Sequence, residues 1–335
     1  LAKLKYMRIA FYSITSKWGI CTILILLLLM GCNSPQKNKT EAPLNKAILA
    51  YEIKAKLGEG AFWNHCTQEF YWVDIEGKSL HIFNPKTKSN KSFPMPSRIG
   101  TAVPKNLTEV VVALEDGVYI MNVDSGDLFL LSDIENNKTQ NRFNDGKCDP
   151  LGRLWVGSMA LNEDKYSGSL YMIDESGKTE LKIDSVTISN GIVWTSNHKT
   201  MYYIDTPTAK IRAFDFDKNT GNISNERVVI EVNDSLGFPD GMAIDEDDML
   251  WVGMWNGNAV IRFDPNTGKI ISKIEVPAHN VTSCAFGGKL LDTLYITTAS
   301  VDMSPEEKAT YPLAGSLFKA VPGVKGVKSS FFGEQ

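Results

Sequence analysis

Carboxylate and amide side chains recur directly before a glycine along this sequence. The four pairs are Glu59-Gly60, Asp145-Gly146, Asn190-Gly191 and Asp240-Gly241. All four side chains offer oxygen, the donor that hard divalent cations prefer. Three carboxylates gathered in a small volume would repel one another unless a cation neutralised them. The pattern indicates a divalent metal site, provided that the fold brings these residues together.

A turn is the ordinary explanation for each pair taken alone, because Asp-Gly and Asn-Gly favour turns. We interpret Pro239 and Gly241 around Asp240 as such a turn, and Asp145 could equally cap one by hydrogen bonding. Recurrence in register favours a shared role for the set. Ile99 and Thr282 stand at the two remaining equivalent places.

The elements that would position these residues recur with them. Period-two strand patterns rich in Val, Ile, Tyr, Phe and Trp alternate with Gly-bearing turns, and no stretch has a helical period. The repeats start near residues 70, 109, 154, 201, 250 and 294. Strands at this spacing predict an all-β fold, a six-bladed β-propeller with four-stranded antiparallel blades. A β-sandwich and two smaller barrels are the alternatives, and both predict irregular spacing.

A propeller places equivalent positions together, because the innermost strand of every blade lines the central channel. Glycine after each polar residue would allow the strands to approach closely there. The ring must also close, and we expect ILAYEIKAKL to pair with the C-terminal strands around GSLFKA. Residues 47–335 are therefore predicted to form a single propeller domain.

The N-terminal segment resembles an export signal. Residues 1–31 carry four basic residues and no acid, and end in a run of about a dozen apolar residues. Leu29-Met30-Gly31-Cys32 resembles a bacterial lipobox, which predicts a lipid-anchored membrane lipoprotein facing the periplasm or the cell exterior. Residues 32–46 would be a polar tether. The alternatives are a signal cut elsewhere or an uncleaved anchor.

Charge and cysteine content exclude other classes. Without the four basic residues of the signal, the formal net charge of −4 becomes about −8, which disfavours nucleic acid as a partner. Cys66, Cys148 and Cys284 lie far apart without CxxC spacing, so they give no thiolate metal site. We expect them to be small core residues, with one disulfide possible.

Several longer motifs resemble the regucalcin/gluconolactonase family, also called senescence-marker-protein-like, whose members are six-bladed propellers. They span the chain from about residue 50 to 320. The matching stretches are LGEGAFW (57–63), NRFNDGKCDPLGRLWVGSM (141–159), ISNGIVW (188–194), YYIDT (202–206), PDGMAID (239–245), LWVGMWNG (250–257), VIRFDPNTGK (260–269) and TSCAFGGK (282–289).

The resemblance implies one divalent metal held by Glu59, Asn190 and Asp240, with Ca²⁺ expected and Zn²⁺, Mn²⁺, Mg²⁺ or Fe²⁺ as alternatives. It also implies that Arg142 and Asn144 bind the substrate. The activity implied is hydrolysis of sugar lactones by a monomer. A metal would make the carbonyl more electrophilic and water more acidic. We assign the base to Asp240, with Asp145 as the alternative.

One stretch departs from the family pattern. Regucalcin-like members have a substrate-contacting Glu shortly after the motif that matches SMA, whereas SMALNEDKYSG is shorter here and places Asn162 or Glu163 near that position. Substrate preference is therefore open. Two other functions remain as alternatives: a propeller that binds calcium or carbohydrate without catalysis, and an arylesterase-like propeller with an apolar pocket mouth.

Overall fold

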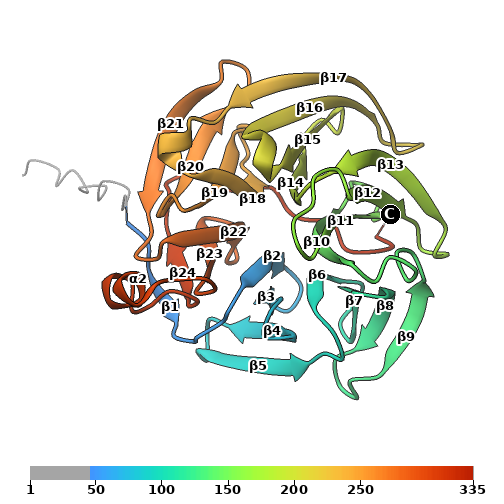
Figure 1. Cartoon of the computed structure of the whole chain (residues 1–335), viewed down its shortest axis with the longest axis horizontal. Helices are drawn as coiled ribbons and strands as arrows, with labels where there is room; N and C mark the ends of the chain where they lie inside the picture. Colours follow the sequence, from blue (N-terminus) through green and yellow to red (C-terminus); the bar gives the residue numbers. More distant parts are fainter. Residues whose placement is uncertain (1–45, 335) are drawn as a thin grey trace, which may run out of the picture. The chain divides into compact units, whose positions relative to one another are not determined.

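The computed structural model describes residues 46–334, which form six four-stranded antiparallel sheets around a central channel (Figure 1). In five blades, the strands follow chain order from the channel outward. Blade 1 contains β2 (Gly58–Asn64), β3 (Glu69–Asp74), β4 (Ser79–Asn84) and β5 (Ser89–Pro94); blade 2 contains β6 (Ile99–Pro104), β7 (Glu109–Leu114), β8 (Gly117–Asn122) and β9 (Leu128–Ser132); blade 3 contains β10 (Asn141–Cys148), β11 (Leu154–Ala160), β12 (Gly168–Ile173) and β13 (Thr179–Val186); blade 4 contains β14 (Ser189–Trp194), β15 (Thr200–Asp205), β16 (Lys210–Asp217) and β17 (Asn222–Glu231); blade 5 contains β18 (Phe238–Ile244), β19 (Leu250–Trp255), β20 (Ala259–Asp264) and β21 (Lys269–Glu275).

Blade 6 closes the ring with strands from both ends of the described chain. It contains β22 (Asn280–Gly287), β23 (Thr293–Ala299), β24 (Leu317–Ala320) and β1 (Ile48–Tyr51). β1 pairs antiparallel with β24, as predicted for the closure, and Lys46 forms a bridge to Glu275 of blade 5. The six-bladed propeller is confirmed. The predicted signal and nearly all of the predicted tether lie outside the described residues.

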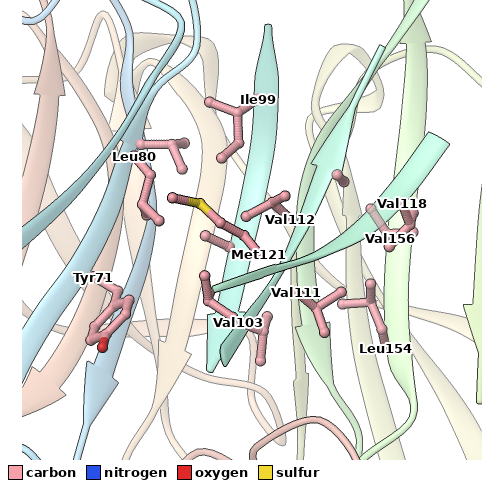
Figure 2. Packing of buried hydrophobic residues seen from close by; sticks show 14 of the residues in the cluster. Tyr71, Leu80, Ile99, Val103, Val111, Val112, Val118, Met121, Leu154 and Val156 are labelled. Atoms are coloured by element: carbon pink, nitrogen blue, oxygen red, sulfur yellow. The ribbon is translucent and has the colours of Figure 1, made fainter. Parts of the chain in front are cut away.

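The fraction of buried residues decreases from the innermost to the outermost strand of a blade. Every residue of β2 and β14 is buried, whereas most residues of the outermost strand β17 are exposed or half-buried. Both faces of a blade pack against neighbouring blades, so the middle strands are rich in aliphatic and aromatic residues, as in EFYWVD of β3 and EVVVAL of β7. Figure 2 shows this packing, with Val111 and Val112 of β7 among side chains from blades 1 and 3.

One local feature was not predicted, and one expectation is wrong. A six-residue helix, α2 (Pro305–Thr310), interrupts blade 6 between β23 and β24, and Ser304 and Glu307 form a capping box at its start. It is too short to produce a helical period. Cys66 is exposed rather than part of the core, while Cys148 and Cys284 are buried, and all three are free.

Two short 3₁₀ turns complete the description. The 3₁₀ turns η1 (Thr206–Thr208) and η2 (Asp234–Leu236) lie in blade 4 and before blade 5. Within residues 46–334, no helix has the length and apolar character needed to cross a membrane.

Candidate functional site

One mouth of the channel opens into a cavity of about 550 Å³. All five residues predicted to bind metal or substrate line it. Glu59, Asn190 and Asp240 come from the innermost strands of blades 1, 4 and 5, and Arg142 and Asn144 come from the innermost strand of blade 3. The propeller therefore brings together side chains that are as far as 181 residues apart in the sequence.

Each of these inner strands contains a β-bulge, which turns a polar side chain toward the cavity. The pairing register shifts between Glu59 and Phe62, between Ser189 and Ile192, and between Pro239 and Met242. A bulge leaves an unpaired residue and redirects its side chain. The predicted turn at Pro239-Asp240-Gly241 is therefore wrong, because these residues lie inside β18. Both structures favour glycine, which is why the sequence pattern suits either.

The glycines after the polar residues allow the strands to converge. A Cβ atom at Gly191 would lie 2.8 Å from the backbone oxygen of Asp240, closer than two such atoms can approach. Gly60 has a φ of +62°, a backbone conformation that other residues rarely adopt. These two positions hold β14 against β18 and fix the bulge beside Glu59.

Glu59 and Asp240 form a buried pair of carboxyl groups. Burial, followed by the negative charge of Asp145, raises the pKa of Glu59 to about 8. Burial and the charges of Glu59 and Asp145 raise the pKa of Asp240 well above its usual value. The two carboxyl groups act directly on each other's titration, so one proton can serve both. The pair therefore resists carrying two negative charges without a cation.

Asp240 also has an unpaired buried atom. Its Oδ1 has no hydrogen-bond partner within the described chain. A buried carboxylate oxygen without a partner is costly, and such groups in native structures need an explanation. The second carboxylate and the amide of Asn190 line the same cavity, so the donor set is all oxygen and suits a hard divalent cation. These residues fit the implied metal.

A directional chain of hydrogen bonds orients the amides. Thr206 Oγ1 donates to the carbonyl of Pro239 at 2.8 Å and accepts from Asn190 Nδ2 at 2.8 Å. Asn190 Oδ1 then accepts from Asn144 Nδ2 at 3.0 Å. Because the Pro239 carbonyl can only accept, it fixes the direction of the whole chain. The chain presents the oxygen of Asn190, and not its amino group, toward Asn144.

Arg142 and Asn144 have different hydrogen-bonding capacity left. Asn144 Nδ2 donates to Ser189 O at 2.7 Å as well as to Asn190, so both of its hydrogens are used. Arg142 Nη1 donates to Asn144 Oδ1 at 2.6 Å and to Phe143 O at 3.0 Å. A guanidinium has five N–H donors, so Arg142 retains several for a ligand. Asn144 retains only a second lone pair on Oδ1.

Asp145 does not line the cavity, although it was the alternative base and a member of the predicted ring. Its Oδ1 accepts the N–H of Gly146 at 2.8 Å, which holds the carboxylate against its own backbone. Burial raises its pKa, and the charge of Lys147 opposes that shift. Ile99 and Thr282 do not line the cavity either.

In residues 46–334, no three His, Cys, Asp or Glu side chains are placed to hold a metal, so the candidate site depends on the amide of Asn190 as well as two carboxylates.

Several cavity residues were not predicted from the sequence. Glu76 and Arg98 line the polar side and pair at 2.7 Å, and Thr206 anchors the hydrogen-bond chain. Thr206 ends the YYIDT motif, which was noted without a role for this residue. Of the two candidates in the departing loop, Glu163 lines the cavity, whereas Asn162 hydrogen-bonds Asp164.

A family description, "SMP-30/Gluconolactonase/LRE-like region", matches residues 57–300. The chain belongs to this family. The matched part contains the whole candidate site, from Glu59 to Asp240, and most of the ring.

Relatives within the SMP-30/gluconolactonase/LRE-like family resemble the chain over most of its length. A Bacillus subtilis (strain 168) protein named "Putative sugar lactone lactonase YvrE" is 40% identical over 274 residues, which are 82% of this chain and 94% of that protein. Regucalcin of Oryctolagus cuniculus is 36% identical over 276 residues, covering 81% of this chain and 92% of the relative. The crystal structure of a calcium-binding protein, regucalcin, from Agrobacterium tumefaciens has a TM-score of 0.82 and 26% identity, covering 85% of this chain and 96% of that one.

Proposed function

We propose that the protein hydrolyses lactones, with sugar lactones as its substrates, and that Glu59, Asn190 and Asp240 hold one divalent cation, with Ca²⁺ expected. The observation that carries the proposal is the buried Glu59–Asp240 pair on a cavity wall, in which Asp240 Oδ1 lacks a partner. The names of the relatives support it, because one is a sugar lactone lactonase by name and another is described as calcium-binding.

Lactone hydrolysis needs an activated carbonyl, a base for the attacking water and a proton for the leaving oxygen. A divalent cation, when bound, supplies Lewis acidity toward a carbonyl and makes water more acidic. A carboxylate oxygen of Asp240 that the cation does not occupy accepts the proton that water loses as its oxygen attacks the carbonyl carbon. The ring C–O bond then breaks, and Asp240 returns the proton to the departing oxygen to give the hydroxy acid.

Arg142 positions the substrate and stabilises charge. Its guanidinium is buried and held by Phe143 O and Asn144 Oδ1, so little ordering is needed when a substrate binds. The free N–H groups can donate to the carbonyl oxygen, on which negative charge develops during attack. Asn144 acts mainly by holding both Arg142 and Asn190 in place.

The test is lactone hydrolysis by chelator-stripped protein reloaded separately with Ca²⁺, Mn²⁺, Zn²⁺ or Fe²⁺. D-glucono-δ-lactone and other aldonolactones are the substrates, and a pH indicator reports the acid produced. We expect Asp240→Ala to lower kcat by about a hundredfold or more, the scale of a lost general base, and to weaken cation binding measured by calorimetry. Circular dichroism should show an intact propeller.

Two other aspartates serve as comparisons. Asp247→Ala, on the exposed side of blade 5, should leave both kcat and cation affinity unchanged. Asp145→Asn distinguishes the two candidate bases, and a larger loss of kcat there than in Asp240→Ala would overturn the assignment to Asp240. Hydrolysis of no aldonolactone with any of the four metals would contradict the proposed function.

A further inference from the structure

Most charged side chains of the cavity lie on one side, whereas its two aromatic side chains lie on the other; Leu57, Met159 and Leu161 add apolar surface to the charged side. Charged groups that could bind a polar ligand come from blades 1 to 3, namely Glu76, Arg98, Arg142 and Glu163. Blades 4 to 6 contribute Asn190, Thr206 and Asp240, which are already used in the hydrogen-bond chain and the carboxyl pair, and Asp302. The rest of their lining is apolar: Ile188, Pro207, Phe238, Trp255 and Val301. A ligand hydroxyl that faced this side would find few partners.

Phe238 and Trp255 are the two aromatic side chains that line the cavity. They lie opposite each other on the paired strands β18 and β19. Phe238 is 40% exposed, and Leu161, which lines the same cavity from blade 3, is also 40% exposed. These apolar side chains adjoin the carboxyl pair and Arg142, so a ligand bound there can cover them. Covering them with apolar surface would be favourable by the hydrophobic effect.

The charge of the cavity selects against anionic ligands. Five carboxyl groups and two guanidinium groups line it, so one negative charge remains in excess even when a divalent cation is bound. Arg98 is engaged by Glu76 at 2.7 Å and by Glu115 at 2.8 Å, which leaves Arg142 as the cation available to a substrate. Glu163 and Asp302 add negative charge without such a partner among the described lining residues. A phosphorylated or carboxylated lactone would meet repulsion here.

We infer that the preferred substrate is a neutral lactone carrying an apolar substituent, alkyl or aryl, that packs against Phe238 and Trp255. This inference rests on the proposed lactonase function and specifies its substrate class. The carbonyl lies beside Asp240, any ring hydroxyl faces Arg142, and the substituent covers the apolar side. A fully hydroxylated aldonolactone remains a substrate but a poorer one, because it would leave Phe238 exposed and place hydroxyl groups against carbon.

The test is a series of δ-lactones with no substituent, then methyl, propyl and pentyl groups, beside D-glucono-δ-lactone. We expect kcat/KM of the metal-loaded protein to rise along the series by up to about fourfold for each methylene that becomes buried. Phosphorylated gluconolactone should be hydrolysed more slowly than gluconolactone. Calorimetric binding of the corresponding alkyl δ-lactams, which resist hydrolysis, should show the same gain with chain length and a more negative heat-capacity change.

Two variants at one position distinguish apolar packing from stacking on a sugar ring. Phe238→Ala should reduce the gain per methylene, whereas Phe238→Leu should retain most of it, because leucine keeps the apolar surface without the aromatic face. Phe129→Ala, at a 62% exposed phenylalanine on the outer strand β9, should leave the whole series unchanged. An equal loss in Phe238→Leu and Phe238→Ala would overturn packing of an apolar substituent.

The two proposals fail in different ways. If gluconolactone is hydrolysed but kcat/KM stays flat or falls along the alkyl series, the substrate inference is overturned and the lactonase proposal stands. If alkyl δ-lactones are hydrolysed but no aldonolactone is, the sugar-lactone proposal is overturned and the substrate inference stands. If no lactone of either kind is hydrolysed, both are overturned.

Discussion

At the scale of single residues, the main feature of the site is a pair of carboxyl groups. Ionising both of them has a large free-energy cost. The pKa of Glu59 is about 8, and that of Asp240 is raised in the same direction. Burial is the first cause for each; the negative charge of Asp145 adds to the shift of Glu59, and the charges of Glu59 and Asp145 add to that of Asp240. A proton or a cation must therefore accompany the pair, and the two compete for the same oxygens.

The first prediction concerns this competition in the metal-free protein. Between pH 4.5, the usual pKa of Glu, and about 8, the folded chain holds a proton at Glu59 that the unfolded chain releases. The stability of the metal-free protein should therefore fall as pH rises through this window. Ca²⁺ displaces the proton, so the increase in Tm caused by Ca²⁺ should grow from pH 5 to pH 8. Differential scanning calorimetry at fixed ionic strength measures both trends.

Glu59→Gln provides the comparison for this prediction. The variant removes one titrating group and one charge, so its Tm should vary less with pH and respond less to Ca²⁺. A Ca²⁺-dependent increase in Tm that is the same at pH 5 and pH 8 would contradict the proton–cation competition.

At the scale of the element, the sequence predicts the inner strands but not the bulges within them. Hydrophobic alternation and the spacing of the repeats were enough to predict the strands, their number and the convergence of Glu59, Asn190 and Asp240. They could not show that Pro239-Asp240-Gly241 lies in a bulge, because a turn has the same local signals. Nor could they show that Asn144 rather than its neighbour Asp145 lines the cavity. That depends on the bulge between Phe143 and Gly146, whose place the spacing does not encode.

A second element repeats in blades 3 and 5 and supports the strands beside the site. In blade 5, Asp245 accepts hydrogen bonds from Trp251 Nε1 at 2.8 Å and Arg262 Nε at 2.7 Å, and also caps the turn that joins β18 to β19. Asp149 does the same for Trp155 and Arg153 in blade 3. Each aspartate is fully buried and links two strands of its blade to their turn.

The prediction at this scale is that Asp245→Ala strongly destabilises the protein. The substitution leaves the Arg262 guanidinium and the Trp251 N–H without their buried partner, for which a loss of about 3–5 kcal/mol is typical. Asp247→Ala is the matched control, because Asp247 also contacts Arg262, at 2.9 Å, but its side chain is 61% exposed. It should cost about 1 kcal/mol or less. Similar losses for the two variants in urea unfolding would contradict a buried structural role for Asp245.

At the scale of the whole molecule, two segments close the ring. β1 completes blade 6, which hydrophobic patterning predicted. The C-terminal segment was not predicted to close anything, because residues 321–334 have little periodicity. It nevertheless bonds to several blades: Val327 N donates to Ile244 O, Phe332 N to Pro104 O and Gly333 N to Gly152 O. Figure 1 shows the C-terminus beside blade 3, far along the ring from β24.

The prediction at this scale is that the C-terminal segment stabilises the ring as a whole. Phe332 is 1% exposed and packs into the core cluster shared by blades 1, 2 and 3. Phe332→Ala should therefore lower the free energy of unfolding by about 3–5 kcal/mol, through lost burial and the cavity left behind. Phe129→Ala, which removes the same atoms from an exposed position, should change it by about 0.5 kcal/mol or less. If the segment only covers the surface, Phe332→Ala will release it to proteases while calorimetry shows an unchanged main transition. If it closes the ring, the single main transition will itself move to lower temperature, because blades 1 to 3 lose a shared part of their core.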